Sequence, residues 1–373
     1  MADKRVTGNE AKHSSPRRWL PWTAAGAALV VGGVIGGVIV GATTQSSAAP
    51  APAVPSAQVS ACAVTSVADQ VLPSVVTISV QGKGGAGTGS GEVIRSGGYI
   101  VTNNHVIAAA ATGGSVEVQF ADGQTAPATI VGRDPQTDLA VIKAGTSAQP
   151  KVIAMGSSAS VQVGEADVVI GAPLGLSGTV TSGIVSALDR DIQVPAEDDS
   201  KALLVGAIQT DSAINPGNSG GAMVNCAGQL IGIPSAGATV PTSSGEPSSG
   251  GSIGLGFAIP VDLAKTISDE IIATGTVTHA YFGVQALPIP PSAAKEAGVP
   301  EGLYVKGVVS GGPAAQAGLR PGDVITKVNG EPATSTVTLQ VLTLTKKPGE
   351  TVPVEYSRNG HSASTTVTLG KQP

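Results

Sequence analysis

The sequence predicts a mainly β protein with two domains and an N-terminal extension. Its 373 residues exceed what one typical domain requires. It contains 51 glycines, and short runs rich in Val and Ile alternate with turn-forming residues, a pattern typical of short strands. Only three Phe and four Tyr are present, so we expect cores built from Val, Ile, Leu and Ala.

A long uncharged stretch follows a basic N-terminus. Residues 1–20 carry more lysines and arginines than acids, and no further charged residue occurs until Asp69. Residues 21–42 are mostly apolar and would extend over about 33 Å as a helix, enough to cross a bilayer. The basic flank would stay in the cytoplasm. We therefore predict a cytoplasmic tail over residues 1–20 and a single-pass transmembrane helix over residues 21–42.

A cleaved signal peptide is the rival interpretation of residues 21–42. Small residues that suit a signal peptidase occur within residues 43–63. The apolar stretch is long for a signal peptide, so we favour a retained anchor in the cell membrane. Residues 43–63 are rich in Ala, Pro and Ser, which is typical of a tether with little apolar bulk to bury. The domains that follow are expected to be extracytoplasmic.

The chain has two cysteines, Cys62 at the end of the tether and Cys226 in the second half of the first domain. Both would face an oxidising compartment, where a disulfide can persist. Pairing would join the entry of that domain to the segment after Ser219. Because a sequence does not establish their separation, a disulfide and two free thiols both stay open.

Ser219 is a candidate nucleophile. Residues 217–221 read Gly-Asn-Ser-Gly-Gly, which places this serine among glycines. A nucleophilic serine needs a sharp turn that exposes its hydroxyl, with backbone N–H groups beside it to bind an oxyanion. Glycine allows both, because it tolerates positive φ and close approach.

His105 and Asp138 are the candidate base and acid. His105 ends a β-branched apolar run, and Asp138 leads directly into the run Leu-Ala-Val-Ile. A carboxylate that enters the interior there needs a hydrogen-bond partner, for which an imidazole Nδ1–H is suited. The order of histidine, aspartate and serine is that of chymotrypsin. Asp134 and Asp122 are the alternative acids, and we favour Asp138.

Residues 217–221 also fit the G-x-S-x-G elbow of α/β-hydrolases, which needs a helix after the serine and the order Ser, Asp, His. Asp262 or Asp269 with His279 would supply that order. The segment 222–233 instead forms two apolar pieces around a turn, which predicts a β-hairpin. The elbow interpretation is therefore weak.

Other classes of site find little support. Residues 82–87 match G-x-G-x-x-G but lead into a strand rather than a helix, so the context of a nucleotide fingerprint is absent. No His/Cys/Asp/Glu cluster has metal-ligand spacing, so we expect no metal and no cofactor. The net charge of −5 and the lack of a basic, aromatic-interleaved run give no case for nucleic acid.

The chain resembles the HtrA/Deg family of serine proteases, and most closely its membrane-anchored actinobacterial members. The resemblance covers roughly residues 66–370. The segments that carry it are 98–107, 138–143, 179–186, 209–221, 254–260 and 311–330.

This resemblance implies a chymotrypsin-type double β-barrel protease domain over residues 64–275 and an α+β PDZ domain over residues 280–370. Apolar residues recur at helical spacing over residues 261–273, which predicts a helix. We expect this helix to join the two domains. By resemblance, the catalytic residues are the base His105, the orienting acid Asp138 and the nucleophile Ser219, and the oxyanion hole is formed by the N–H groups of Gly217 and Ser219, with Asn218 shaping the loop.

Substrate preference follows from the residues around the nucleophile. Trypsin-like digestive proteases place an aspartate six residues before the serine, and here that position is Ala213, which predicts small or medium aliphatic residues at P1. Pro234 replaces an asparagine that is usual in the family and lacks an N–H for pairing with substrate. The candidate specificity residues are Ala213, Ile214, Ile233 and Ser235.

The second domain would bind peptides. By resemblance to PDZ domains, the loop that holds a peptide C-terminal carboxylate is Tyr281, Phe282, Gly283 and Val284, and the peptide adds as an edge strand. We expect strands over residues 303–309 and 351–356, and a helix over residues 335–347 beside the groove.

We predict a membrane-tethered, extracytoplasmic serine endopeptidase of protein quality control that cuts unfolded or mislocalised proteins. By resemblance it would form a trimer. A chaperone or peptide-binding scaffold is the rival from another class, and the complete set of His105, Asp138 and Ser219 disfavours it.

Overall fold

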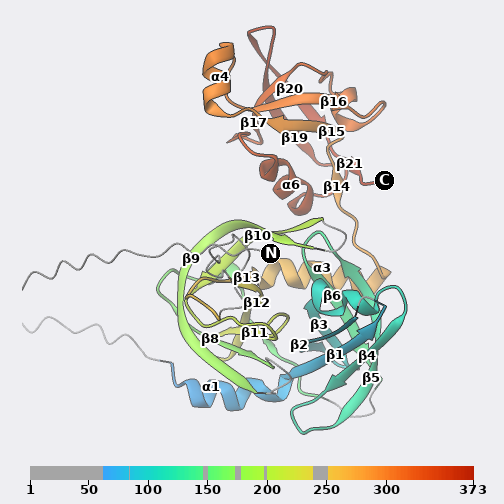
Figure 1. The fold of residues 1–373 in the computed structure, drawn as a ribbon, viewed down its shortest axis with the longest axis vertical. Coiled ribbons are helices and arrows are strands. Elements are labelled where there is room, and N and C mark those ends of the chain that lie inside the picture. Colours follow the sequence, from blue (N-terminus) through green and yellow to red (C-terminus); the bar gives the residue numbers. More distant parts are fainter. Residues whose placement is uncertain (1–61, 84, 146–149, 173–177, 197–199, 238–250) are drawn as a thin grey trace, which may run out of the picture. The chain divides into compact units, whose positions relative to one another are not determined.

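All described residues fall in one compact unit of the chain. The predicted cytoplasmic tail, transmembrane helix and almost all of the tether lie outside the described residues. Among the helices of the described part, none combines the length and apolar character needed to span a membrane. The computed structural model (Figure 1) describes residues 62–83, 85–145, 150–172, 178–196, 200–237 and 251–373.

The first half of the protease region is a closed antiparallel barrel with strand order β1-β2-β3-β6-β5-β4. Alternate residues point inward, as the period of two in a strand requires, and Ile78, Ile100 and Ile142 fill the interior without exposed surface. The barrel thus has the aliphatic core that the composition predicted. Its strands are β1 (Val75–Gly82), β2 (Gly85–Arg95), β3 (Tyr99–Asn103), β4 (Gly114–Gln119), β5 (Thr125–Asp134) and β6 (Leu139–Ala144).

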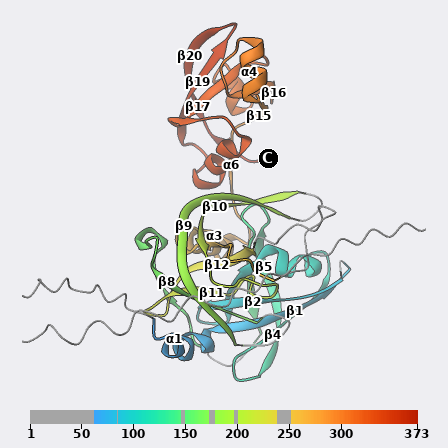
Figure 2. The same cartoon turned by 60° about the vertical axis from the view of Figure 1, so that its left-hand side comes forward.

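The second half is a seven-stranded sheet with order β11-β8-β9-β10-β13-β12-β7, whose strands β11 and β12 also pair with each other. That pair is the hairpin predicted after Ser219, so the α/β-hydrolase elbow is wrong. Strand β9 is long and strongly curved (Figure 2). The strands are β7 (Ala154–Met155), β8 (Ala166–Gly171), β9 (Thr179–Pro195), β10 (Lys201–Thr210), β11 (Ala222–Asn225), β12 (Gln229–Gly237) and β13 (Gly256–Pro260).

One hydrophobic cluster joins the two halves. Leu139 and Val141 of β6 pack in it with Ile170 of β8 and Ile233 of β12, and none of the four has exposed surface. Burying apolar area at this junction stabilises one arrangement of the halves. The loops that flank these strands are thereby brought to the same place, and the candidate site lies there.

A helix and a disulfide secure the entry of the described chain. Helix α1 (Val64–Val71) buries Val67 and Val71 and continues through the 3₁₀ turn η1 (Leu72–Ser74) into β1. Cys62, just before α1, forms a disulfide with Cys226 in the turn between β11 and β12, with a Cα–Cα distance of 5.1 Å. Of the two alternatives that the sequence left open, the structure has the bonded pair.

The helix predicted over residues 261–273 is α3 (Val261–Thr274). It buries Ala264, Ile267 and Ile271, which recur at helical spacing. It ends at Gly275, whose φ of 79° places it in the left-handed region and whose N–H donates to the Ile271 carbonyl. The remaining short helices of the described protease region are α2 (Asn104–Ile107), η2 (Ala108–Ala110) and η3 (Ser158–Ser160).

The C-terminal part has its own core around a sheet of order β15-β16-β17-β19-β20, and β18 pairs with β17. The predicted strands and helix are confirmed with small shifts at their ends. Ser335 caps α6 through its side chain, which accepts a hydrogen bond from the Val337 N–H. The elements are β14 (Ala280–Tyr281), β15 (Val284–Pro288), α4 (Pro291–Ala297), β16 (Leu303–Val308), α5 (Pro313–Gln316), β17 (Val324–Val328), β18 (Glu331–Pro332), α6 (Thr336–Thr345), β19 (Thr351–Arg358), β20 (His361–Thr368) and β21 (Gly370–Lys371).

Candidate active site

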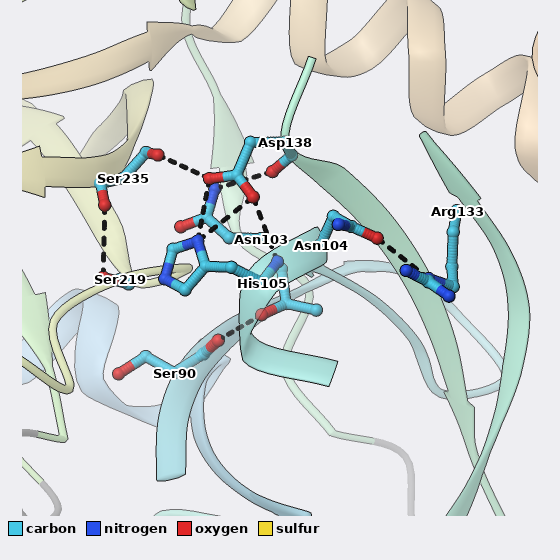
Figure 3. A network of polar contacts seen from close by, with 9 residues as sticks. Ser90, Asn103, Asn104, His105, Arg133, Asp138, Ser219 and Ser235 are labelled. Atoms are coloured by element: carbon cyan, nitrogen blue, oxygen red, sulfur yellow. Dashed lines mark hydrogen bonds and ion pairs between the residues drawn. The ribbon is translucent and has the colours of Figure 1, made fainter. Parts of the chain in front are cut away.

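Three segments far apart in the sequence meet at the junction of the two halves (Figure 3). His105 lies in the short helix α2 that follows β3, and Asp138 is the residue before β6. Ser219 lies in the loop between β10 and β11. Because β3 pairs with β6, the end of one strand and the start of the other bring the histidine and the aspartate together.

The imidazole of His105 is held by the carboxylate of Asp138. Its Nδ1 lies 2.9 Å from Oδ2 and 3.1 Å from Oδ1, and its backbone N–H donates to Oδ1 at 3.0 Å. The carboxylate is 4 % exposed, whereas the imidazole is 41 % exposed. A Nδ1–H that donates to this carboxylate leaves Nε2 without a proton, and this is the tautomer that a general base requires.

Asp138 has a left-handed backbone, with φ of 58°, which non-glycine residues rarely adopt. Two donors hold its carbonyl oxygen, the Asn104 N–H and the Asn103 side-chain amide, each at 3.0 Å. These bonds offset the cost of the conformation and turn the carboxylate toward the histidine. The sequence pattern contained no signal for this backbone geometry.

Ser235 is a further partner of the same carboxylate. Its buried hydroxyl donates to Asp138 Oδ2 at 2.6 Å. We predicted Ser235 as a specificity residue, and the structure shows in addition that its hydroxyl binds the candidate acid Asp138 (Figure 3). Sequence reasoning missed this contact because 97 residues separate the two side chains.

The hydroxyl of Ser219 donates to the carbonyl of Ser235 at 3.3 Å. Within the described residues it makes no hydrogen bond to His105. Catalytic hydrogen bonds are often long or misaligned without substrate. For a proton transfer, this hydroxyl has to turn from the Ser235 carbonyl toward Nε2 of His105.

The loop around Ser219 leaves two N–H groups open. Gly217 has φ of 101°, and the described part of the chain contains no hydrogen bond from the N–H of Gly217 or of Ser219. The buried side chain of Asn218 donates to the Ala213 carbonyl at 3.2 Å, and its N–H donates to Asn215 at 3.0 Å. Two unpaired N–H groups beside a serine hydroxyl can stabilise an oxyanion.

A buried carboxyl group supports the start of this loop. Asp167 has no exposed surface and accepts hydrogen bonds from the Thr210 hydroxyl at 2.7 Å and the Ser212 hydroxyl at 2.6 Å. Burial raises its pKa, and the two hydroxyls offset this only in part. Both hydroxyls precede Ala213, so this cluster anchors the chain that leads to Ser219.

A cleft of about 440 Å³ opens beside His105 and Asp138. Of the four specificity candidates, only Ser235 lines it. Ile233 is fully buried in the core between the two halves, and Ile214 is 5 % exposed and packs near Gly256. The remaining lining residues are Ile192, Gln193, Val194, Pro195, Ala236, Gly237 and Phe257. None of these was singled out from the sequence.

Pro234 lies inside β12, where a register shift between Pro234 and Ala236 marks an irregularity. Such a position tolerates the missing N–H of proline. Its carbonyl accepts a hydrogen bond from the Gly220 N–H at 2.8 Å. Pro234 therefore helps to hold the loop around Ser219.

The rival acids and the rival base have other partners. Asp134 forms a buried pair with His279, at 2.9 Å between Oδ1 and Nε2, and also accepts from the Thr137 hydroxyl. Asp122 binds Gln124, and Asp269 pairs with Arg95. Asp262 accepts from the Ser157 and Ser158 hydroxyls.

In the C-terminal part, a groove of about 440 Å³ lies between β15 and α6. Val284 of the predicted carboxylate loop lines it, together with residues of α6 such as Leu339. Phe282 is 3 % exposed and packs in the core, and Gly283 has φ of 80°. The loop turns at the glycine, and Phe282 anchors it.

Comparison with known proteins identifies two domains in the chain. A trypsin-like peptidase domain matches residues 89–233, and a PDZ domain matches residues 279–369. The serine protease PepD of Mycobacterium tuberculosis is 45 % identical over 332 residues, covering 87 % of this chain and 70 % of that protein.

A probable periplasmic serine endoprotease, DegP-like, of Brucella suis is 40 % identical over 288 residues. The match covers 76 % of this chain and 53 % of that relative, so the chain spans about half of its length. Among solved structures, the HtrA-type protease AlgW with a decapeptide has 32 % identity and a TM-score of 0.66, covering 83 % of this chain and 99 % of that chain. The serine endoprotease from Yersinia pestis has 34 % identity and a TM-score of 0.61, with 83 % and 98 % covered.

Proposed function

Because the chain belongs to the HtrA/Deg family of serine proteases, and is thus a serine endopeptidase with a trypsin-like peptidase domain and a PDZ domain, we propose that Ser219 is its nucleophile and His105 its general base. The observation that carries this proposal is the meeting of Ser219, two open N–H groups and an imidazole held by a buried carboxylate.

The reaction proceeds through an acyl-enzyme. Nε2 of His105 takes the proton of the Ser219 hydroxyl as Oγ attacks the peptide carbonyl carbon. The same nitrogen then gives this proton to the departing amine, and a water molecule repeats the sequence on the ester. Asp138 stays ionised, holds Nδ1–H and stabilises the imidazolium.

The N–H groups of Gly217 and Ser219 bind the oxyanion of the tetrahedral intermediates. Losing one such donor typically costs about 10²–10³ in kcat. Asn218 shapes the loop through its bonds to Ala213 and Asn215. Backbone donors held in this way need no reorganisation as charge develops.

The substrates are unfolded or mislocalised proteins with small or medium aliphatic residues at P1. Ala213 in place of an acid supports this preference, and the walls that Ile192, Val194 and Phe257 contribute to the cleft are apolar. Extended backbone is accessible to an endopeptidase in unfolded chains, which fits a role in protein quality control.

The protease is anchored in the cell membrane through residues 21–42, with both domains outside the cytoplasm. The basic residues before this segment and its apolar length support the orientation. Relatives described as periplasmic support the compartment. The active form is a homotrimer, as the family resemblance suggests.

Digestion of a permanently unfolded casein-like protein by the full-length chain, beside its Ser219→Ala variant, tests the function. We expect cleavage by the first and none by the second, with equal thermal unfolding of both. Wild-type cleavage by the variant would show that Ser219 is not the nucleophile. If neither protein cleaves but both hold the unfolded chain in solution, the rival function of a chaperone scaffold is favoured.

A further inference from the structure

We propose that Ser90 is a positioning residue that holds the oxyanion loop, residues 217–219, in its reactive shape. The inference rests on the proposed role of the Gly217 and Ser219 N–H groups. Ser90 belongs to β2 of the first barrel, whereas the loop belongs to the second half of the protease region. Ser90 has no exposed surface.

One residue holds two carbonyls of the loop. The Ser90 N–H donates to the Ser219 carbonyl at 3.0 Å, and its hydroxyl donates to the Gly217 carbonyl at 2.6 Å. The strand that carries Ser90 is itself held, since the Thr102 hydroxyl donates to the Ser90 carbonyl at 2.7 Å. The contact therefore ties the loop to a rigid element of the other barrel.

The direction of the Ser90 hydroxyl proton follows from its neighbours. The Ala172 N–H lies 2.8 Å from Ser90 Oγ and can only donate. The Gly217 carbonyl can only accept. The single hydroxyl proton is therefore committed to Gly217, and the hydroxyl has no other orientation that satisfies both partners.

These bonds fix alternate peptide units of the loop. In the Gly217–Asn218 unit, Ser90 holds the carbonyl and the Asn215 carbonyl holds the N–H, at 3.0 Å. Since a peptide unit is planar, bonds at both ends determine its orientation.

The Ser219–Gly220 unit is held in the same way. Ser90 binds its carbonyl, and the Pro234 carbonyl accepts its N–H at 2.8 Å. Between these two fixed planes lies the unit that carries the Ser219 N–H. Its orientation is thereby set toward the position of the oxyanion.

The hydroxyl matters most at Gly217. With φ of 101°, this glycine occupies a region that glycine enters and leaves without steric cost. Without the bond from the Ser90 hydroxyl, the Gly217–Asn218 unit can rotate about Gly217, and the relative direction of the Gly217 and Ser219 N–H groups is no longer fixed. The loop also packs closely against β2 and β3, because a Cβ at Gly220 would overlap the Ser90 carbonyl and Thr102 Oγ1.

The test is the full-length Ser90→Ala variant, assayed with an unfolded protein and an internally quenched peptide. Active sites are first counted by titration with a phosphonylating reagent, so that unfolded enzyme does not enter kcat. We expect kcat per active site to fall by about 10- to 100-fold and KM to change by less than about threefold, since an oxyanion contact acts in the transition state. Affinity for a peptide aldehyde, which forms an oxyanion in the site, should fall in parallel with kcat.

Thr77→Val is the matched control. Thr77 pairs with Ser90 across β1 and β2, is 5 % exposed, and its hydroxyl has no partner among the described residues. Its kcat and aldehyde affinity should equal those of the wild type. Ser90→Cys, with similar volume and a weak donor, is the second variant in case Ser90→Ala does not fold, and it should also lose kcat.

The outcomes separate this inference from the proposed function. If Ser219→Ala is inactive while Ser90→Ala and Ser90→Cys keep wild-type kcat per active site and aldehyde affinity, Ser90 does not position the loop. If kcat and KM of the Thr77→Val control change as they do for Ser90→Ala, the effect is general packing and the inference also fails. Activity in Ser219→Ala would instead contradict the proposed nucleophile.

Discussion

At the scale of residues, the site depends on one buried carboxylate with several donors. Asp138 is 3 % exposed and binds the imidazole and backbone N–H of His105 together with the Ser235 hydroxyl. An ionised carboxylate in such a place requires these bonds. Each hydrogen bond also constrains the orientation of the group that donates it. The contacts that satisfy the buried carboxylate of Asp138 therefore also orient the imidazole of His105.

Asp138→Asn should reduce kcat by about 10⁴, because an amide that donates toward Nδ1 favours the tautomer with a protonated Nε2. Thermal unfolding and KM should change little. Steady-state kinetics on a quenched peptide measures this effect. A loss of less than tenfold would show that Asp138 does not set the tautomer of His105.

Ser235→Ala should reduce kcat by about 10- to 100-fold, since a hydrogen bond to a charged group contributes about 1.5–3 kcal/mol. The carbonyl of residue 235 remains, so the Ser219 contact is retained. Ser235→Thr, which keeps the hydroxyl, is the rescue variant. Equal losses in both variants would assign the effect to packing rather than to the bond with Asp138.

At the scale of elements, two ties outside the site stabilise the fold. The disulfide between Cys62 and Cys226 joins the segment just before α1 to the turn of the β11–β12 hairpin across 164 residues. In the C-terminal domain, Asp323 before β17 pairs with Arg358 at the end of β19. Both ties connect segments that do not follow each other in the chain.

The double variant Cys62→Ser/Cys226→Ser should lose about 2–5 kcal/mol of unfolding free energy, because the cross-link restricts the unfolded chain. Denaturation with and without a reductant measures this. Reductant should destabilise the wild type and leave the double variant unchanged. Equal stability of the oxidised wild type and the double variant would contradict the prediction.

The pair of Asp323 and Arg358 predicts a loss of stability in acid. Burial alone would raise the pKa of Asp323, but hydrogen bonds from the Arg358 guanidinium and the Arg320 N–H, together with the charges of both arginines, lower it. A lowered pKa in the folded state adds stability above the ordinary aspartate pKa of about 3.9. This contribution disappears as pH falls below that value toward the folded pKa.

Melting curves of full-length Asp323→Asn and wild-type protein between pH 7 and pH 2 measure this contribution. We expect the C-terminal domain of the variant to melt at a lower temperature at pH 7, and the difference from the wild type to shrink in acid. A difference that is constant with pH would exclude the ionised pair as its source.

At the scale of the whole molecule, the protein combines a trypsin-like peptidase domain with a PDZ domain. The groove between β15 and α6 is lined by apolar residues such as Leu287 and Leu339 and by Val284 of the loop 281–284, which we predicted to hold a carboxylate. The HtrA-type protease AlgW has been solved with a tripeptide and with a decapeptide. We propose that peptide C-termini bind here and favour an active arrangement of the loops around Ser219.

A peptide with a free C-terminal carboxylate should bind the full-length Ser219→Ala variant at least about tenfold more tightly than its amidated form, since a charge-assisted hydrogen bond contributes more than about 1.4 kcal/mol. Calorimetric titration with the matched pair measures the difference. The same free-acid peptide should raise the rate of the wild-type enzyme on an unrelated substrate. Equal affinity of the two forms would rule out capture of the carboxylate.

Several local features could be predicted from the sequence. The Gly-Asn-Ser-Gly-Gly turn, the β-hairpin after it, and the helices α3 and α6 each depend on neighbouring residues and their period. His105 was singled out at the end of an apolar run, Asp138 at the start of one, and Ser219 among glycines that permit a sharp turn. The family resemblance added the double barrel and the PDZ domain.

Only the tertiary structure decided which distant groups touch. The Ser235 hydroxyl on Asp138, the Ser90 hydroxyl on Gly217, the pairing of Cys62 with Cys226 and the burial of Ile233 all depend on how the two halves of the protease region pack. The sequence by itself determined the chemistry, because reactive groups and turns are local properties of the chain. Their alignment arises from contacts across 33 to 127 residues, which local patterns do not encode.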